Sequence, residues 1–162
     1  MRIENRQSAK KGIINTMNTK QKLEQALKEA MRSGDKTAKN VIRLVMTNLK
    51  LIEVDHGSQD ESGVIALIQK EIKMRQESIK EAEKGDRADV INNNQIEIEY
   101  LKSFLPVQMT EDEVRQVIQE IAAEVGATNM KDMGAVMQGA AERIQGRASN
   151  KLISQIAREL LS

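Results

Sequence analysis

The spacing of apolar residues constrains the fold of this chain most strongly. From Asn18 onward, Leu, Ile, Val, Met and Ala recur every three to four residues, and no segment alternates apolar and polar residues for long enough to form a strand. Such spacing places apolar side chains on one face of an α-helix. Apolar residues make up 40% of the chain and aromatic residues only 1%, a composition typical of packed helices. The sequence therefore predicts an all-α fold.

Composition excludes several kinds of site. The chain has no cysteine, so disulfides, thiolate metal sites and a cysteine nucleophile are excluded. The longest apolar clusters are much shorter than the ~20 residues of a membrane span. Residues 1–16 lack the hydrophobic segment of a secretory signal. We therefore expect a cytoplasmic protein with no membrane partner, no metal and no cofactor.

Capping residues, glycines and the single proline predict the domain organisation. The expected helix caps are Asn18 or Thr19, Asp35, Asp60, a capping box at 110–113 and Ser149. Residues 17–105 contain four expected helices, which form an N-terminal helical domain. Pro106 pushes the preceding residue out of helical conformation and marks the boundary, as a rigid elbow or as a hinge. Residues 107–162 contain three expected helices, which form a small C-terminal domain. Residues 1–16 carry four cations against one anion, a net charge of +3, and are interpreted as a disordered basic extension in preference to an organelle transit peptide.

A glycine- and methionine-rich segment lies between residues 126 and 150. Gly134 and Gly139 fall inside the expected sixth helix, where each costs roughly 1 kcal/mol relative to alanine. This cost indicates a close approach to another helix or to a partner. The methionines at 130, 133 and 137 share one helix face, which favours a core stripe. An adaptable protein-binding groove is the alternative interpretation.

Four sequence stretches carry a resemblance to a known family. In order along the chain they are VIRLVMTNLK (41–50), IKMRQESI (72–79), YLKSFLP (100–106) and EVGATNMKDMGAVM (124–137). With this spacing the chain resembles the YqeY family, and the resemblance covers residues 17–162. The family is similar to the C-terminal region of the B subunit of tRNA-dependent amidotransferase.

The resemblance implies a helical protein of two parts and a role near tRNA. In the amidotransferase this region is implicated in holding tRNA, while catalysis lies in other domains and subunits. The domain is also fused to some aminoacyl-tRNA synthetases. By similarity to the amidotransferase, stand-alone members are assigned carbon–nitrogen ligase activity with glutamine as amido-N-donor. We therefore expect an accessory or tRNA-binding module. Its expected partners are tRNA and an aminoacyl-tRNA synthetase or amidotransferase component.

The candidate nucleic-acid-binding residues lie near the C-terminus. They are the cations of the last two helices and the glycine of the turn between them: Arg143, Arg147, Lys151, Arg158 and Gly146. Such a basic end of a small domain could hold a phosphate backbone, whereas ordinary solubilising charge is the alternative. Ala135 stands where the family usually has a lysine, and its presence predicts weaker phosphate contact.

The residues do not predict a catalytic centre. Gly134 and Gly139 have the spacing of a phosphate loop, but Ala140 stands where its lysine should be. His56 is the only histidine and is interpreted as a turn residue. Glu97 and Glu99 are two apart on a helix and point in different directions. Whether the protein is an enzyme therefore stays open, with no catalytic residue assigned.

Arg43 lies among apolar residues of the expected second helix. We expect it to be a buried structural partner of a carboxylate such as Glu71 or Glu77. An exposed anchor for a partner is the alternative interpretation.

Overall fold

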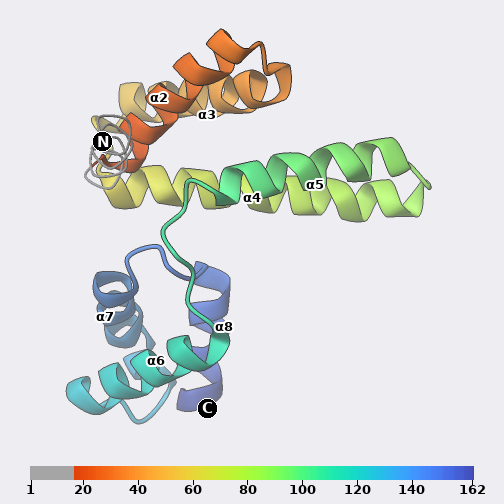
Figure 1. The fold of residues 1–162 in the computed structure, drawn as a ribbon. Coiled ribbons are helices and arrows are strands. Elements are labelled where there is room, and N and C mark those ends of the chain that lie inside the picture. The colour runs from red at the N-terminus through yellow and green to blue at the C-terminus, as the bar shows by residue number, and fades with distance from the viewer. Residues whose placement is uncertain (1–16) are drawn as a thin grey trace, which may run out of the picture. The chain divides into compact units, whose positions relative to one another are not determined.

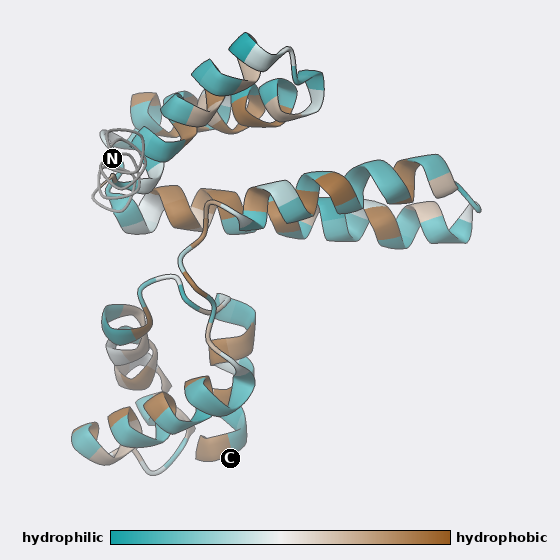
Figure 2. Ribbon diagram, in the orientation of Figure 1, coloured by the Kyte–Doolittle hydropathy of each residue, from teal (hydrophilic) through white to brown (hydrophobic). Residues whose placement is uncertain are grey.

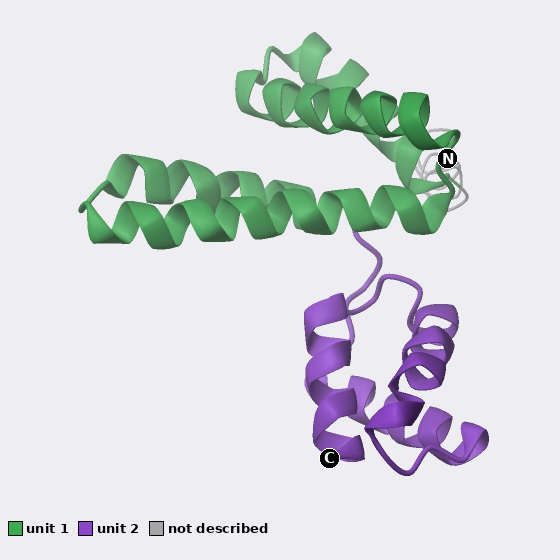
Figure 3. Cartoon of the chain, turned by 180° about the vertical axis from the view of Figure 1, so that it is seen from behind, with its two compact units in different colours: residues 1–104 green, residues 105–162 purple. Residues whose placement is uncertain are grey.

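The computed structural model describes residues 17–162, so the extension predicted for residues 1–16 lies outside the described residues. In this part of the chain the regular elements are seven α-helices and one 3-10 turn, with no strand. The prediction of an all-α fold is confirmed. The chain divides into two compact units, Met1–Phe104 (unit 1) and Leu105–Ser162 (unit 2), which Figure 3 shows in different colours.

Unit 1 consists of two helical hairpins. The first pairs α2 (Thr19–Ser33) with α3 (Lys36–His56), and the second pairs α4 (Glu61–Lys84) with α5 (Ala88–Lys102). Figure 1 shows the far end of the second hairpin projecting beyond the first. The helices begin at predicted capping residues, because the side chains of Asn18, Asp35 and Asp60 accept hydrogen bonds from the first turns.

Aliphatic side chains from both hairpins form the core of unit 1. In Figure 2 the hydrophobic segments of the helices recur along their length, as the sequence spacing requires. The largest fully buried side chains of this unit are Leu23, Ile42, Val45, Leu49, Val64, Ile68 and Leu101. The two aromatic rings, Tyr100 and Phe104, pack edge to face with centroids 5.3 Å apart. Burial of aliphatic side chains therefore holds the hairpins together.

A buried polar network links three helices of unit 1. Arg75 of α4 lies 2.8 Å from the Glu71 carboxylate and 2.7 Å from that of Glu97 on α5. Asn48 of α3 donates a hydrogen bond of 2.8 Å to Glu71. Burial lowers the pKa of Arg75, but its hydrogen bonds with Glu71 and Glu97 outweigh burial and raise the pKa overall. The prediction that Arg43 is the buried partner is wrong, because Arg43 is exposed.

Unit 2 consists of α6 (Glu111–Val125), a 3-10 turn (Met130–Asp132), α7 (Met133–Ile144) and α8 (Asn150–Leu161). Thr110 and Glu113 form the predicted capping box at the start of α6. The core contains residues from all three helices and one, Ala148, from the turn between α7 and α8. These residues are Val114, Ile118, Ile121, Val136, Ala140, Ile144, Ala148, Ile153, Ile156, Ala157 and Leu161.

The two helical glycines of α7 have different surroundings. A Cβ atom at Gly139 would lie 2.8 Å from Cγ2 of Ile121 on α6, whereas one at Gly134 would meet nothing within 4 Å. The predicted close approach is therefore a helix–helix contact, and Gly139 makes it. Met133 and Met137 pack against the core, which confirms their interpretation as a core stripe, while Met130 is 46% exposed.

Within residues 17–162, none of the helices combines the length and apolar character that a membrane span requires.

Candidate nucleic-acid interface

The turn between α7 and α8 positions the candidate residues. Gln145 and Gly146 have φ values of 49° and 78°, in the left-handed region that favours glycine. These conformations end α7 and reverse the chain. Ser149 then begins α8, because its hydroxyl accepts a hydrogen bond of 3.2 Å from the backbone N–H of Leu152.

Three hydrogen bonds tie this turn to the segment that enters unit 2. The backbone N–H of Met109 donates to the carbonyl of Arg147 at 2.7 Å. The side chain of Arg147 donates from Nε to the carbonyl of Val107 at 3.0 Å, and Gln108 donates to the carbonyl of Gly146 at 3.2 Å. Arg147 is therefore anchored through Nε while its side chain remains exposed.

Arg143 makes a different kind of contact. Its guanidinium pairs with the carboxylates of Glu120, at 3.6 Å, and Glu124, both on α6. The hydrogen bond from Arg143 holds the pKa of Glu124 below its ordinary value, and the same bond raises the pKa of Arg143. Arg143 therefore fastens α7 to α6, and two carboxylates offset its charge.

Lys151 and Arg158 lie on one exposed face of α8. They are seven residues apart, which is close to two helical turns. In the part of unit 2 that the structure describes, no ion pair within 4.0 Å involves either side chain. The neighbouring carboxylate of Glu159 pairs instead with Arg115 of α6 at 2.7 Å, which lowers the pKa of Glu159.

The five candidate residues therefore divide into three groups. Gly146 and Arg147 form the anchored turn, Lys151 and Arg158 present charge on α8, and Arg143 is paired with α6. The contact between Arg147 and the 107–109 segment was missed by sequence reasoning. The two segments are about 40 residues apart, and no local pattern indicates that they meet.

Other residues considered for chemistry lie apart from this interface. His56 is the last residue of α3 and is exposed, and Ala140 is part of the unit 2 core. Glu97 pairs with Arg75, while Glu99 lies 3.2 Å from Lys102. Across the described residues, no group of three or more His, Asp or Glu side chains could hold a metal ion.

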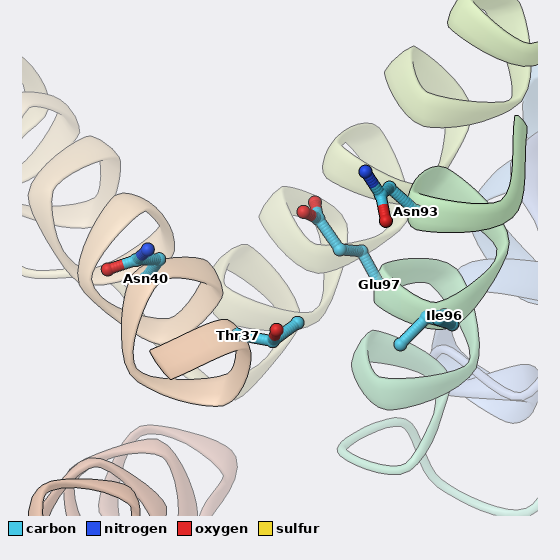
Figure 4. Close-up of a pocket in the computed structure, with 5 residues that line it drawn as sticks. All are labelled: Thr37, Asn40, Asn93, Ile96 and Glu97. Atoms are coloured by element: carbon cyan, nitrogen blue, oxygen red, sulfur yellow. The ribbon is translucent and has the colours of Figure 1, made fainter. Parts of the chain in front are cut away.

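Unit 1 contains one further feature of note, a small pocket of about 200 Å³ between α3 and α5. Figure 4 shows its lining residues, of which Thr37 and Asn40 come from α3 and Asn93, Ile96 and Glu97 from α5. Glu97 is about a third exposed here, although one of its oxygens is occupied by Arg75. The pocket is thus mostly polar, with Ile96 as its apolar member.

Curated proteins with related sequences share one name, "Altered inheritance of mitochondria protein 41, mitochondrial". The protein from Lachancea thermotolerans is 30% identical over 140 residues, covering 81% of this chain and 74% of the relative. That from Pyrenophora tritici-repentis is 29% identical over 131 residues, covering 78% and 71%. The Meyerozyma guilliermondii protein is 31% identical over 122 residues, covering 72% and 63%.

These relatives contradict the expected cytoplasmic location, because they are named as mitochondrial proteins. That expectation rested on the lack of a secretory signal, which bears on export and not on entry into an organelle. It also rested on interpreting the basic residues 1–16 as a disordered extension and not as an organelle transit peptide. The family model described as "Yqey-like protein" matches residues 20–161, which run from the first turn of α2 to the end of α8. The chain therefore belongs to the Yqey-like protein family.

Proposed function

We propose that this protein is an accessory RNA-binding module linked to aminoacyl-tRNA metabolism, in which unit 2 holds the phosphate backbone of tRNA. One observation carries the proposal. Lys151 and Arg158 lie exposed on one face of α8, without the ion pairs that engage Arg143 and Arg115. Arg147 lies just before this helix, with its side chain exposed and anchored.

The charge distribution of unit 2 supports binding of RNA along α8. The first turn of α6 carries Glu111, Asp112 and Glu113, whereas α8 carries Lys151 and Arg158. Exposed cations without ion pairs attract a polyanion, and here that applies to Lys151 and Arg158. Arg147 lies near Glu113, whose carboxyl pKa is lowered first by the hydrogen bonds of its capping box and further by Arg147. Each cation that contacts a phosphate releases bound counterions, so the affinity of such a surface falls steeply with salt.

The kind of RNA follows from the residue types and from the resemblance. Unit 2 contains no aromatic residue, so it lacks the stacking platforms with which proteins bind single-stranded bases. Recognition of a folded RNA through phosphates and shape is the remaining mode. The similarity of the family to a tRNA-holding region of the amidotransferase favours tRNA. Ala135, in place of the usual lysine, shifts the contact toward α8.

The proposal is tested by measuring the binding of full-length protein to total tRNA over a salt series. We expect affinity to fall as salt rises, and the double variant Lys151→Ala/Arg158→Ala to bind more weakly with a shallower salt slope. The control is Lys80→Ala, which removes an exposed cation of unit 1. Binding that is independent of salt, or equal loss in the control, would contradict the proposal.

The enzyme and adaptor alternatives receive separate tests. The proposal assigns no catalytic centre to the chain, so the pure protein should release no ammonia from glutamine with tRNA and ATP present. Ammonia release that survives repurification would favour the ligase activity credited to the family. A methionine-lined adaptor groove is not favoured, because Met133 and Met137 pack against the core of unit 2.

We further propose that units 1 and 2 are separate domains, with four helices in residues 17–105 and three in residues 107–162. Their separate cores support this division. A fragment of residues 105–162 should unfold cooperatively with nearly the same midpoint as unit 2 in the whole chain. A fragment that is unfolded at low temperature would contradict independence.

A further inference from the structure

The outer face of α3 carries a heptad pattern that the core of unit 1 does not use. Cations recur every seven residues at Lys36, Arg43 and Lys50. Each cation is followed directly by one residue of a stripe, and the next residue of the stripe lies three positions later. The stripe consists of Thr37, Asn40, Leu44, Thr47, Leu51 and Val54. In a coiled coil the cations would occupy position g and the stripe positions a and d. The apolar part of this seam covers the last three turns of the helix.

The seam is exposed, whereas the other apolar residues of α3 are buried or partly buried. Leu44, Leu51 and Val54 are 47%, 60% and 83% exposed. The core residues of the same helix lie on its other side: Ala38, Val41, Ile42, Val45 and Leu49. A single exposed leucine needs no explanation, but three aliphatic residues at coiled-coil spacing form a second apolar stripe on one helix.

A row of exposed cations flanks the seam on one side. Lys36, Arg43 and Lys50 are exposed, and no ion pair within 4.0 Å involves them in residues 17–162. The nearest acidic side chain along the helix, Glu53, pairs with Lys20 of α2 at 2.8 Å instead. The seam therefore has a basic flank that makes no ion pair within 4.0 Å in residues 17–162. The hydrogen bond from Lys20 lowers the pKa of the Glu53 carboxyl group, and Lys50 helps to lower it at longer range.

We propose that this seam docks an acidic amphipathic helix of another protein. Its apolar residues would pack on Leu44, Leu51 and Val54, and its carboxylates would face the cations at Arg43 and Lys50. In coiled coils the residues at e and g set the choice of partner in this way. The site lies on unit 1 and is independent of the RNA surface proposed for unit 2.

The pocket between α3 and α5 continues the seam toward the start of α3. Two of its lining residues, Thr37 and Asn40, belong to the stripe itself, and Ile96 of α5 is half exposed beside them. A helix laid along α3 would therefore also meet α5 at this end.

The chemistry of the seam favours this occupant over three others. RNA phosphates would pair with the cations but would leave the three aliphatic side chains exposed to water. A lipid surface would favour cations on both flanks, whereas the other flank has Asn48 and Asp55. A second copy in antiparallel orientation would place Arg43 and Lys50 against cations, and a parallel copy would offer only Asp55 to Lys50.

The probe for this proposal is a synthetic helix of three heptads, as long as α3, with Leu at a and d and Glu at e and g. The controls are a scrambled peptide of the same composition and a peptide with Lys in place of Glu. Binding to the full-length protein is measured by fluorescence anisotropy. We expect the acidic peptide to bind at least tenfold more tightly than the scrambled peptide.

Two variants of the protein locate the binding. Leu44→Ser/Leu51→Ser should weaken binding of the acidic peptide at least tenfold. Arg43→Glu/Lys50→Glu should weaken it similarly and should strengthen binding of the Lys peptide, a gain that misfolding cannot produce. The control Lys80→Glu makes the same kind of charge change on α4. It should leave the affinity for both peptides unchanged.

Three outcomes would overturn the proposal. The first is equal binding of the acidic and scrambled peptides. The second is a dimer of the protein alone, seen by sedimentation, that Leu44→Ser/Leu51→Ser disrupts, because the occupant would then be a second copy. The third is binding to anionic phospholipid vesicles that depends on Leu51 while the acidic peptide does not bind.

Discussion

A methyl group on Gly139 would lie 2.8 Å from Cγ2 of Ile121, so α7 approaches α6 more closely than any residue with a Cβ atom allows. Ile121 is branched at Cβ and buried in the unit 2 core, and it therefore has little freedom to move away. The glycine that weakens the helix locally is required by the packing of two helices.

The first prediction compares the two helical glycines of α7. Gly139→Ala should destabilise unit 2 by about 1–2 kcal/mol, because overpacking outweighs the gain in helix propensity. Gly134→Ala should stabilise it by up to about 1 kcal/mol, since a Cβ atom there meets nothing within 4 Å. Urea unfolding of both variants measures the difference. Equal effects of the two substitutions would contradict the helix–helix contact.

The second prediction concerns the buried arginine of unit 1. Arg75→Ala leaves the Glu71 carboxylate, which is 3% exposed, with Asn48 as its remaining side-chain partner. The free energy of unfolding should fall by about 3–5 kcal/mol. The matched control, Arg32→Ala, removes an exposed pair with Glu29 and should change stability by less than about 0.5 kcal/mol. A similar small loss for Arg75→Ala would show that the network is not structurally required.

The third prediction is a pH dependence of unit 2. Arg143 holds the folded-state pKa of Glu124 below its ordinary value of 4.5. A carboxylate with a lowered folded pKa contributes stability above its unfolded pKa and loses it as pH falls through the folded pKa. Stability should therefore fall below about pH 4.5. In Arg143→Ala the fall should be less steep, because Glu124 then has similar pKa values in both states. Urea unfolding between about pH 5 and pH 3 checks this, and unchanged steepness would contradict it.

The fourth prediction separates the roles of two arginines in tRNA binding. Arg147→Ala should weaken binding several-fold and lower the salt slope, because its exposed side chain is anchored at the entrance to α8. Arg143→Ala should have a smaller effect, since Glu120 and Glu124 already offset its charge. Filter binding at two salt concentrations gives both quantities. A larger loss for Arg143→Ala would place the RNA on α7 instead.

Local chemistry made much of the secondary structure predictable from the sequence. Asn18, Asp35, Asp60, Thr110 and Ser149 cap helices as expected, because a short polar side chain satisfies backbone N–H groups within three residues of itself. The sixth helix was predicted to start near residues 129–132. Its first turn is a 3-10 turn at Met130–Asp132, and α7 itself begins at Met133. Helix boundaries of this kind depend on packing as well as on local residues.

The candidate interface was only partly predictable. The sequence identified the cations near the C-terminus but could not separate Arg143 from Arg147, because both follow a similar local pattern. Their difference depends on distant residues, Glu124 on α6 for the first and Val107 for the second. The buried arginine was wrongly predicted to be Arg43 for the same reason, since only tertiary packing brings Glu97 to Arg75.

The sequence by itself determined that this protein is helical, where most of its helices begin and end, and which family it belongs to. Those properties depend on residues within a few positions of one another, or on a pattern along the chain. The tertiary structure decided which glycine makes a close contact, which arginine is buried and which cations remain without ion pairs. Such outcomes depend on side chains tens of residues apart, which meet only when the helices pack.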